Sequence, residues 1–160
     1  MTLRTMKTEE VRQAAVSLVT RRMLTAAQLE EKLLAKGAEP EQAEEVLDWA
    51  REIGLTDDRA YARELVAYYQ ARGYGLHKIK AELCRRKVPR DLWEEALAEM
   101  APADDTIDRL LQAKLQDPRD QKQVKKAADA LGRRGFSWEQ ISEALHRFRR
   151  NWEDETGGSV

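Results

Sequence analysis

Residues 72–91 read RGYGLHKIKAELCRRKVPRD and predict one short helix held between two turns. Leu76, Ile79 and Leu83 recur at intervals of three and four residues, which places them on one face of a helix. The stretch holds seven basic residues and two acidic ones, a net charge of +5, in a chain whose net charge is −1. An amphipathic helix with a basic outer side therefore stands in the middle of a mildly acidic protein.

Three stretches of fifteen residues align without gaps and define a repeat. Each begins and ends with Leu, has Lys or Arg at the fourth place and has Glu at the thirteenth. The copies are offset by 50 and 48 residues, a period typical of repeat architectures. The three stretches are Leu33–Leu47 (LLAKGAEPEQAEEVL), Leu83–Leu97 (LCRRKVPRDLWEEAL) and Leu131–Leu145 (LGRRGFSWEQISEAL).

Each copy has the pattern of a helix, a turn and a second helix. Gly37 and Gly135 follow the first helix at the point where a left-handed C-cap is wanted. Lys87 occupies this position in the middle copy. The middle turn must therefore either place a lysine in an unfavourable left-handed conformation or adopt a different geometry. Residues 137–140 form a capping box at the start of a following helix, and residues 25–28 form another.

A further helix precedes each copy, so each repeat is predicted to contain three helices. Asp57 and Asp105 each lie 26 residues before the aligned Leu, where carboxylates cap free N–H groups at a helix start. No stretch alternates with period two, so we expect an all-α fold of nine helices in three tandem repeats that share apolar surface as solenoids do. The predicted boundaries are 1–54, 55–101 and 102–152 for the repeats, and 153–160 for a disordered tail.

Composition excludes several classes of protein. The 28 basic and 29 acidic residues nearly balance, which argues against a protein that coats nucleic acid. The single cysteine, Cys84, makes no intramolecular disulfide and no cysteine-based metal site. No apolar run approaches the length of a membrane span, and the first ten residues lack the core of a signal peptide. We expect a cytoplasmic monomer with no membrane partner.

Enzyme chemistry has little support in the sequence. There is no glycine-rich phosphate loop, no nucleophile with an evident base and no cluster of metal ligands, so we expect no catalytic residue, cofactor or metal. Asp57 and Asp58 are adjacent carboxylates and raise the alternative of a catalytic pair or a metal site. Their position at a helix start, matched by Asp105, favours capping.

Two basic clusters, one in the middle repeat and one in the last, are the candidate contacts with a partner. The alternative for both is a solvated helix face with pairs such as Glu82 with Arg86, and compensation of helix dipoles. Tyr74 lies among basic residues and can anchor an interface, whereas Trp93 falls on a repeat position typical of the core. The candidate residues are Arg72, Tyr74, Lys78, Arg85, Arg86 and Arg90, with Arg133, Arg134, Arg147, Arg149 and Arg150.

Three motifs together resemble the RecX family of bacterial regulators of the recombinase RecA. The strongest is LTDDRAYA at residues 55–62, which looks like the central signature of that family. TAAQLEEKL at 25–33, followed by KG at 36–37, is similar to its N-terminal signature, and RRGFSWEQI at 133–141 to its C-terminal one. The resemblance covers residues 10–150 with the motifs in the family's order, and Lys87 departs from it where the family usually has Gly.

The resemblance implies a function as well as a fold. Proteins of this family are tandem three-helix repeats that bind RecA filaments on single-stranded DNA, as elongated, curved molecules that lie in the filament groove. They limit filament growth, ATPase activity, strand exchange and co-protease activity. A direct DNA-binding module of helix–turn–helix type is the alternative, since its Arg-rich second elements can enter a groove. An adaptor for another protein remains if neither partner binds.

Overall fold

The computed structural model describes residues 5–157, and this part of the chain is entirely helical, as the sequence predicts. It contains nine α-helices and one short 3₁₀ helix, and no strand. The elements are α1 (Thr8–Arg21), α2 (Ala26–Ala35), α3 (Pro40–Glu52), α4 (Asp58–Ala71), α5 (Leu76–Arg85), η1 (Arg90–Leu92), α6 (Trp93–Ala98), α7 (Asp104–Lys114), α8 (Gln121–Arg133) and α9 (Trp138–Glu155).

The described residues group into two compact units, each of which takes part of the middle repeat. Unit 1 comprises residues 5–65 and 83–98, and unit 2 comprises residues 66–82 and 99–157. The divisions fall inside α4, inside α5 and directly after α6. Each unit therefore holds one complete three-helix bundle together with segments of α4 and α5.

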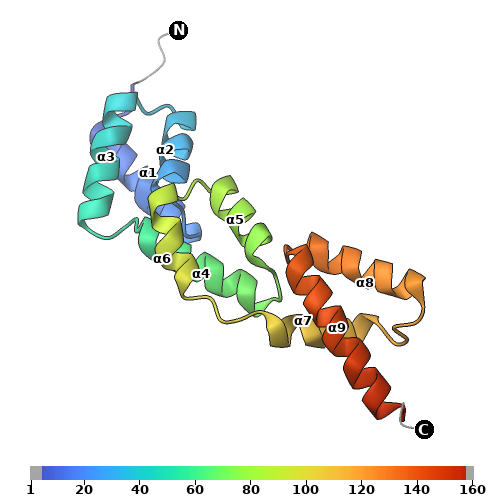
Figure 1. The fold of residues 1–160 in the computed structure, drawn as a ribbon. Helices are drawn as coiled ribbons and strands as arrows, with labels where there is room; N and C mark the ends of the chain where they lie inside the picture. Colours follow the sequence, from blue (N-terminus) through green and yellow to red (C-terminus); the bar gives the residue numbers. More distant parts are fainter. Residues whose placement is uncertain (1–4, 158–160) are drawn as a thin grey trace. The chain divides into compact units, whose positions relative to one another are not determined.

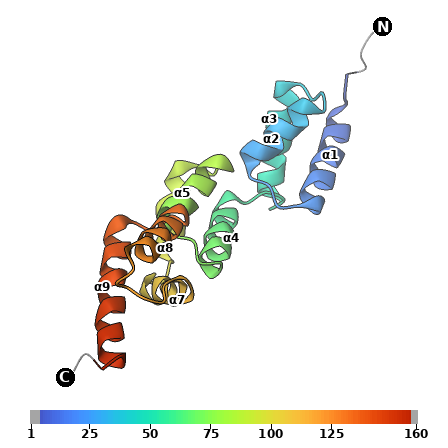
Figure 2. The ribbon, with the colours of Figure 1, turned by 90° about the vertical axis from the view of Figure 1, so that its right-hand side faces the viewer.

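The core of unit 1 lies between α1, α2 and α3, which Figures 1 and 2 show side by side. Val11, Leu29, Leu33 and Val46 are fully buried there. All four occupy positions three, four or seven residues from another buried residue of the same helix, so each helix turns one apolar face inward. The predicted inward residues Ala43, Leu47 and Ala50 of α3 are buried as well.

The core of unit 2 is built in the same way between α7, α8 and α9 (Figures 1 and 2). Ile107, Leu111 and Leu131 are fully buried, and Phe136 after α8 packs against them. Along α9, the residues predicted to face inward are buried at Ile141, Ala144 and Leu145, and Phe148 is partly buried against this cluster.

Helix starts follow the predicted capping signals. Thr25 and Ser137 each accept a hydrogen bond from the backbone N–H three residues later, with the reciprocal glutamine bond that completes a capping box. Asp57 accepts a hydrogen bond from the N–H of Ala60 at 3.1 Å, as expected of a cap. Asp120 caps α8 by accepting from two backbone N–H groups of its own first turn.

The turns after α2, α5 and α8 share one left-handed residue. Gly37 and Gly135 have φ of 107° and 98°, as predicted for C-caps. Lys87 adopts the same conformation with φ of 62°, and it is the only residue other than glycine with positive φ in the described chain. The middle turn thus has the same backbone conformation as the other two, although a residue with a Cβ disfavours it. The Lys87 side chain forms an ion pair with Glu31.

Three local features differ from the sequence-based expectation. The third helix of the middle repeat begins as the 3₁₀ turn η1 before α6. Helix α9 continues to Glu155, so residues 153–155 of the predicted disordered tail are helical. Residues 158–160 of that tail lie outside the described residues. Helix α7 starts after Ala103, whose side chain provides no cap, although Asp104 and Asp105 lie in the first turn.

Candidate functional site

In unit 2, the turn after α8 caps the start of α5. The N–H of Gly75 donates to the Arg134 carbonyl at 2.7 Å, and the N–H of His77 donates to the Gly135 carbonyl at 3.0 Å. A Cβ atom on Gly75 would lie 2.6 Å from the Gly135 carbonyl group, and one on Gly135 would lie 2.4 Å from the backbone nitrogen of Lys78. Two glycines therefore permit the close contact that brings the negative end of α8 to the positive end of α5.

The Arg134 side chain completes this contact. Its Nη1 donates to the Arg72 carbonyl at 3.0 Å and to the Gly73 carbonyl at 3.4 Å. Its guanidinium also lies over the Tyr74 ring, at 5.2 Å from the centroid, and Tyr74 packs edge-on against Tyr69. Among the candidate partner-binding residues, Arg134 and Tyr74 thus have structural roles within unit 2.

Unit 1 contains the corresponding contact one repeat earlier. Thr25 Oγ1, at the start of α2, donates to the Arg86 carbonyl after α5 at 2.8 Å. The next N–H, that of Ala26, donates to Asp58 Oδ1 at 2.9 Å, and Arg86 Nη1 donates to the Tyr61 hydroxyl at 3.1 Å. Asp58 and Tyr61 belong to the LTDDRAYA motif, so this motif secures one helix end against another. The adjacent carboxylates of Asp57 and Asp58 thus each accept a backbone N–H at the start of a helix.

The other candidates of the middle repeat vary in how firmly they are held. Arg72 is exposed and stacks on Tyr68, with its guanidinium 3.5 Å from the ring centroid. Arg90 is exposed and lies over Trp93 at 4.9 Å. Lys78 pairs with the buried Glu82 at 3.5 Å, the i,i+4 arrangement typical of a helix face. Arg85 is exposed on the last turn of α5 but also has a contact partner.

The C-terminal cluster separates into a structural residue and an exposed set. Arg147 makes a bidentate contact with Asp108, with Nη2 to Oδ1 at 2.9 Å, and so ties α9 to α7. The hydrogen bonds to Asp108 raise the pKa of the Arg147 guanidinium above its ordinary value. Arg133, Arg149 and Arg150 are exposed, and no described acidic side chain forms an ion pair with them.

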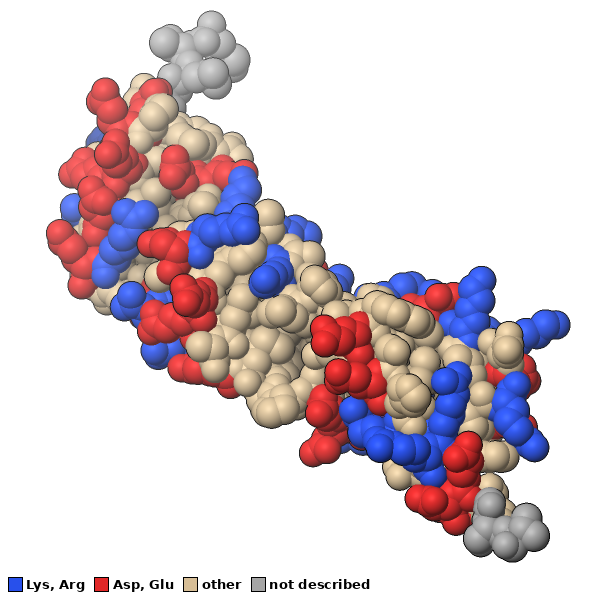
Figure 3. Space-filling view, in the orientation of Figure 1, with Lys and Arg blue, Asp and Glu red and all other residues tan. Residues whose placement is uncertain are grey.

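Basic residues that the sequence interpretation did not single out lie in the same unit. Lys114 and Lys126 line a hollow of about 250 Å³ at the end of α7 and along α8, together with the candidate residue Arg133. Figure 3 shows basic side chains gathered over the part of unit 2 that holds α8, whereas both signs of charge are interspersed over unit 1. The run QKQVKK at residues 121–126 is the sequence signal for this surface, since its lysines recur at three and four residues.

A second exposed feature is aromatic. Trp138, the first residue of α9, is 69% exposed, more than any other large hydrophobic side chain in the described chain. It borders a hollow of about 470 Å³ that Arg133, Phe136 and Ile141 also line. Its place inside a capping box predicts a helix start but does not reveal that the indole faces solvent.

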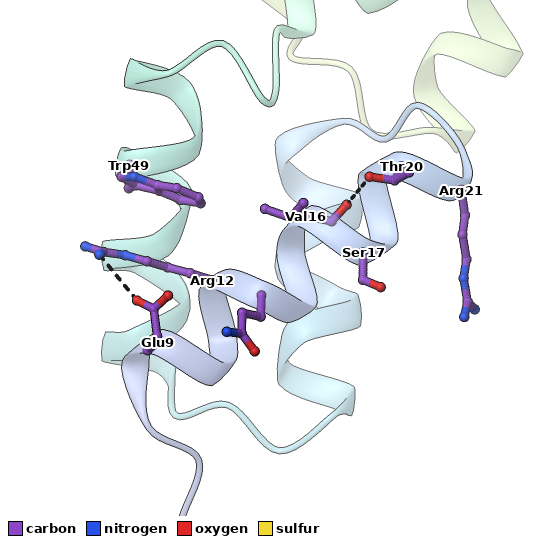
Figure 4. Close-up of a pocket in the computed structure, with 8 residues that line it drawn as sticks. Glu9, Arg12, Val16, Ser17, Thr20, Arg21 and Trp49 are labelled. Atoms are coloured by element: carbon purple, nitrogen blue, oxygen red, sulfur yellow. Dashed lines mark hydrogen bonds and ion pairs between the residues drawn. The ribbon is translucent and has the colours of Figure 1, made fainter.

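Unit 1 has a hollow of about 680 Å³ between α1 and α3, which Figure 4 shows. Arg12 lies across the Trp49 ring, at 5.3 Å from its centroid, and within 3.8 Å of Glu9. Val16 forms an apolar wall, and the lining includes neither histidine nor cysteine. No group of three metal-binding side chains occurs among the described residues.

Three-helix units with interlocking helix ends, and with cations on the outside, define a protein of tandem helical repeats. The family model "RecX, second three-helix domain" matches residues 57–97, and "RecX, first three-helix domain" matches residues 12–49. A relative from Pseudomonas fluorescens (strain SBW25), named "Regulatory protein RecX", is 36% identical over 140 residues, 84% of this chain and 89% of its own. The chain belongs to the RecX family of regulatory proteins.

More distant relatives and solved structures agree with this family. A "Regulatory protein RecX" from Vibrio parahaemolyticus is 32% identical over 148 residues, 90% of this chain and 92% of the relative. The crystal structure of RecX from Lactobacillus salivarius superposes with a TM-score of 0.78 over 88% of this chain and 95% of its own, at 18% identity. That likeness bears on the fold. None of the described helices is long and apolar enough to cross a membrane.

Proposed function

We propose that this protein is a negative regulator of the RecA recombinase that binds the filament RecA forms on single-stranded DNA. The observation that carries the proposal is membership of the RecX family, with 36% identity to a named regulatory protein over 84% of the chain. Bound protein limits filament growth and, with it, ATPase activity, strand exchange and co-protease activity. Binding shifts the filament population only to the extent that the protein prefers one filament state over another.

The repeat architecture supports this proposal through avidity. Copies of one helical unit in a single chain offer several contact surfaces to a partner that is itself a repeating polymer. A second contact by the same chain is intramolecular, so it adds affinity without a second diffusional encounter. Each copy can therefore bind weakly by itself and still hold the protein on a filament.

The exposed members of the predicted set are the proposed contact residues. Arg72, Arg90, Arg149 and Arg150 present guanidinium groups at the surface, where arginine is among the side chains that contribute most to interfaces. Arg86, Arg134 and Arg147 are proposed to act only by holding helix ends and bundles in place, because their guanidiniums already bind groups of the same unit. Lys78, Arg85 and Arg133 complete the proposed contact residues, and Tyr74 supports the Arg134 guanidinium that lies over its ring.

The first test is the single-stranded-DNA-dependent ATPase of the RecA from the same organism, titrated with this protein. Inhibition well below one molecule per RecA protomer indicates capping of filament ends or propagated disassembly. Inhibition only near stoichiometric amounts indicates occupation along the filament. An unchanged ATPase, together with no binding of RecA filaments in a sedimentation assay, would refute the proposal.

A matched pair of double variants tests the contact residues. Arg149→Gln with Arg150→Gln removes two exposed charges of the proposed surface, and Arg21→Gln with Arg22→Gln removes two adjacent exposed charges outside it. We expect the first variant to need several-fold more protein for half-inhibition and the second to behave as wild type. Equal loss in both variants means that net charge, rather than this surface, determines the inhibition.

A further inference from the structure

Two hollows in unit 2 share Arg133. The basic hollow is lined by Lys114 at the end of α7, by Lys126 and Arg133 on α8, and by two alanines of α8. The indole hollow is lined by Trp138, Phe136 and Ile141 together with residues of α8 that include Arg133 and Asp129. Because Arg133 borders both hollows, one ligand can occupy the two hollows and contact Arg133 between them.

The basic hollow gathers three cationic side chains in one lining. None of its lining residues is acidic, and no described carboxylate forms an ion pair with any of its three cations. Lys126 and Arg133 are seven residues apart, two turns along the same face of α8, and the small Ala130 between them leaves the space open. Cations held close together without counter-charges favour an anionic ligand, and their separation along a helix suits a chain of phosphates better than a single small anion.

The indole hollow offers a flat aromatic face on a rigid element. Trp138 is the first residue of α9, whose start is ordered by the Ser137 capping box, and 69% of the tryptophan is exposed. Beside it, apart from the adjoining residues and backbone of α8 itself, no atom lies within 4 Å of the position that a Cβ on Gly132 would take, so no other side chain fills this space. Asp129 places a negative charge on this side, which disfavours a second phosphate here and favours an uncharged ring.

We propose that unit 2 binds single-stranded nucleic acid, with backbone phosphates in the basic hollow and a base stacked on Trp138. Cationic side chains line the hollow on one side of Arg133, and aromatic side chains line the hollow on the other side. A nucleotide has the matching arrangement, because its phosphate and its base lie on opposite sides of the sugar. Proteins that bind single strands combine a positively charged track with aromatic platforms in this way. A duplex does not present a free base face to the indole, so the proposal is specific for single strands.

The test uses the whole protein without any recombinase, so its result is independent of the proposed function. Fluorescence anisotropy follows binding to a labelled oligo(dT) of about 20 nucleotides at several ionic strengths. Three phosphate contacts predict that the logarithm of the binding constant falls with the logarithm of salt concentration with a slope of about −2. An unlabelled duplex of the same length serves as competitor, and we expect it to compete less well than the unlabelled single strand.

Variants separate the two halves of the site. Trp138→Ala is expected to weaken oligo(dT) binding about tenfold at constant salt, and Trp138→Phe to restore most of the affinity because it keeps a stacking ring. Lys126→Gln with Arg133→Gln is expected to flatten the salt slope to about −0.7. The control, Lys32→Gln with Lys36→Gln, removes two exposed charges from unit 1 and is expected to leave slope and affinity unchanged.

Several outcomes overturn the proposal. Absence of oligo(dT) binding at low salt does so directly. Equal losses in the two double variants mean that any exposed cation suffices, and tighter binding of duplex means that the indole plays no part. A Trp138→Ala variant that keeps full oligo(dT) affinity but fails to bind RecA filaments would assign this surface to a protein partner instead. Circular dichroism of each variant checks that the helical content is retained.

Discussion

Replacing Gly135 with alanine is the most direct test of how the last repeat is joined to α5. Gly135 has φ of 98°, and its added Cβ would lie 2.4 Å from the backbone nitrogen and 2.6 Å from the Cβ of Lys78. The atoms it meets belong to or adjoin the backbone of α5, so no side chain can rotate away to make room. We expect the turn after α8 to move off the start of α5, which breaks the hydrogen bonds donated by Gly75 and His77.

The expected loss of stability has two contributions. An alanine in the left-handed region costs about 1 kcal/mol relative to glycine. The two backbone hydrogen bonds contribute about 1 kcal/mol each. Gly135→Ala is therefore expected to lower the free energy of unfolding by about 3 kcal/mol. Gly37→Ala is the matched control, because Gly37 has φ of 107° at the equivalent repeat position but no atom within 4 Å of its Cβ position. Its expected loss is about 1 kcal/mol.

Urea unfolding followed by circular dichroism measures both losses. With a slope of about 2 kcal/mol per molar urea, the midpoint is expected to fall by about 1.5 M for Gly135→Ala and by about 0.5 M for Gly37→Ala. Amide hydrogen exchange gives the local result, since the N–H groups of Gly75 and His77 are expected to lose protection only in the first variant. Equal losses of stability in the two variants, with protection of these amides retained, would refute the proposed joining contact.

Three further substitutions test other details by the same urea measurement. Lys87→Gly removes a strained φ but also an exposed ion pair, so we expect a gain of about 0.5 kcal/mol; a loss would mean that the pair with Glu31 outweighs the strain. Gly132→Ala, in α8 with open space around it, is expected to gain about 0.5–1 kcal/mol, and no gain would show that this glycine is needed. Arg147→Gln is expected to lose about 1–2 kcal/mol, and adding Asp108→Asn should cost little more, whereas additive losses would contradict a direct pair.

Much of the fold could be predicted because its signals are local. A capping box such as that of Thr25 and Gln28 involves one turn of helix, and the spacing of apolar residues requires only the period of the helix. The conformation of the turn at Lys87 is harder to predict, because a lysine adopts the left-handed region only when the surrounding structure of the repeat stabilises it. The 3₁₀ start at Arg90 and the length of α9 depend on packing that no short pattern records.

The candidate surface was less predictable because it depends on which residues meet across the sequence. Arg134 and Arg72 are 62 residues apart, and nothing in their local sequence distinguishes an arginine that binds a carbonyl from one that faces solvent. The same applies to Arg147, whose partner Asp108 is 39 residues away. The hollow formed by Lys114 and Arg133 likewise requires two helices to be placed before its charges can be seen together.

The way each middle helix begins has a consequence for how many copies such a chain can carry. Helix α2 starts with a hydroxyl that reaches the turn after α5, and α5 starts with N–H groups that reach the turn after α8. Helix α8 instead satisfies its first N–H groups with its own Asp120. A middle helix whose first N–H groups make no contact with the turn of a later copy is typical of the terminal, capping repeat of a linear array. A further copy after α9 would therefore call for a residue at position 120 that, like Thr25, caps its own helix and also reaches the turn of the following copy.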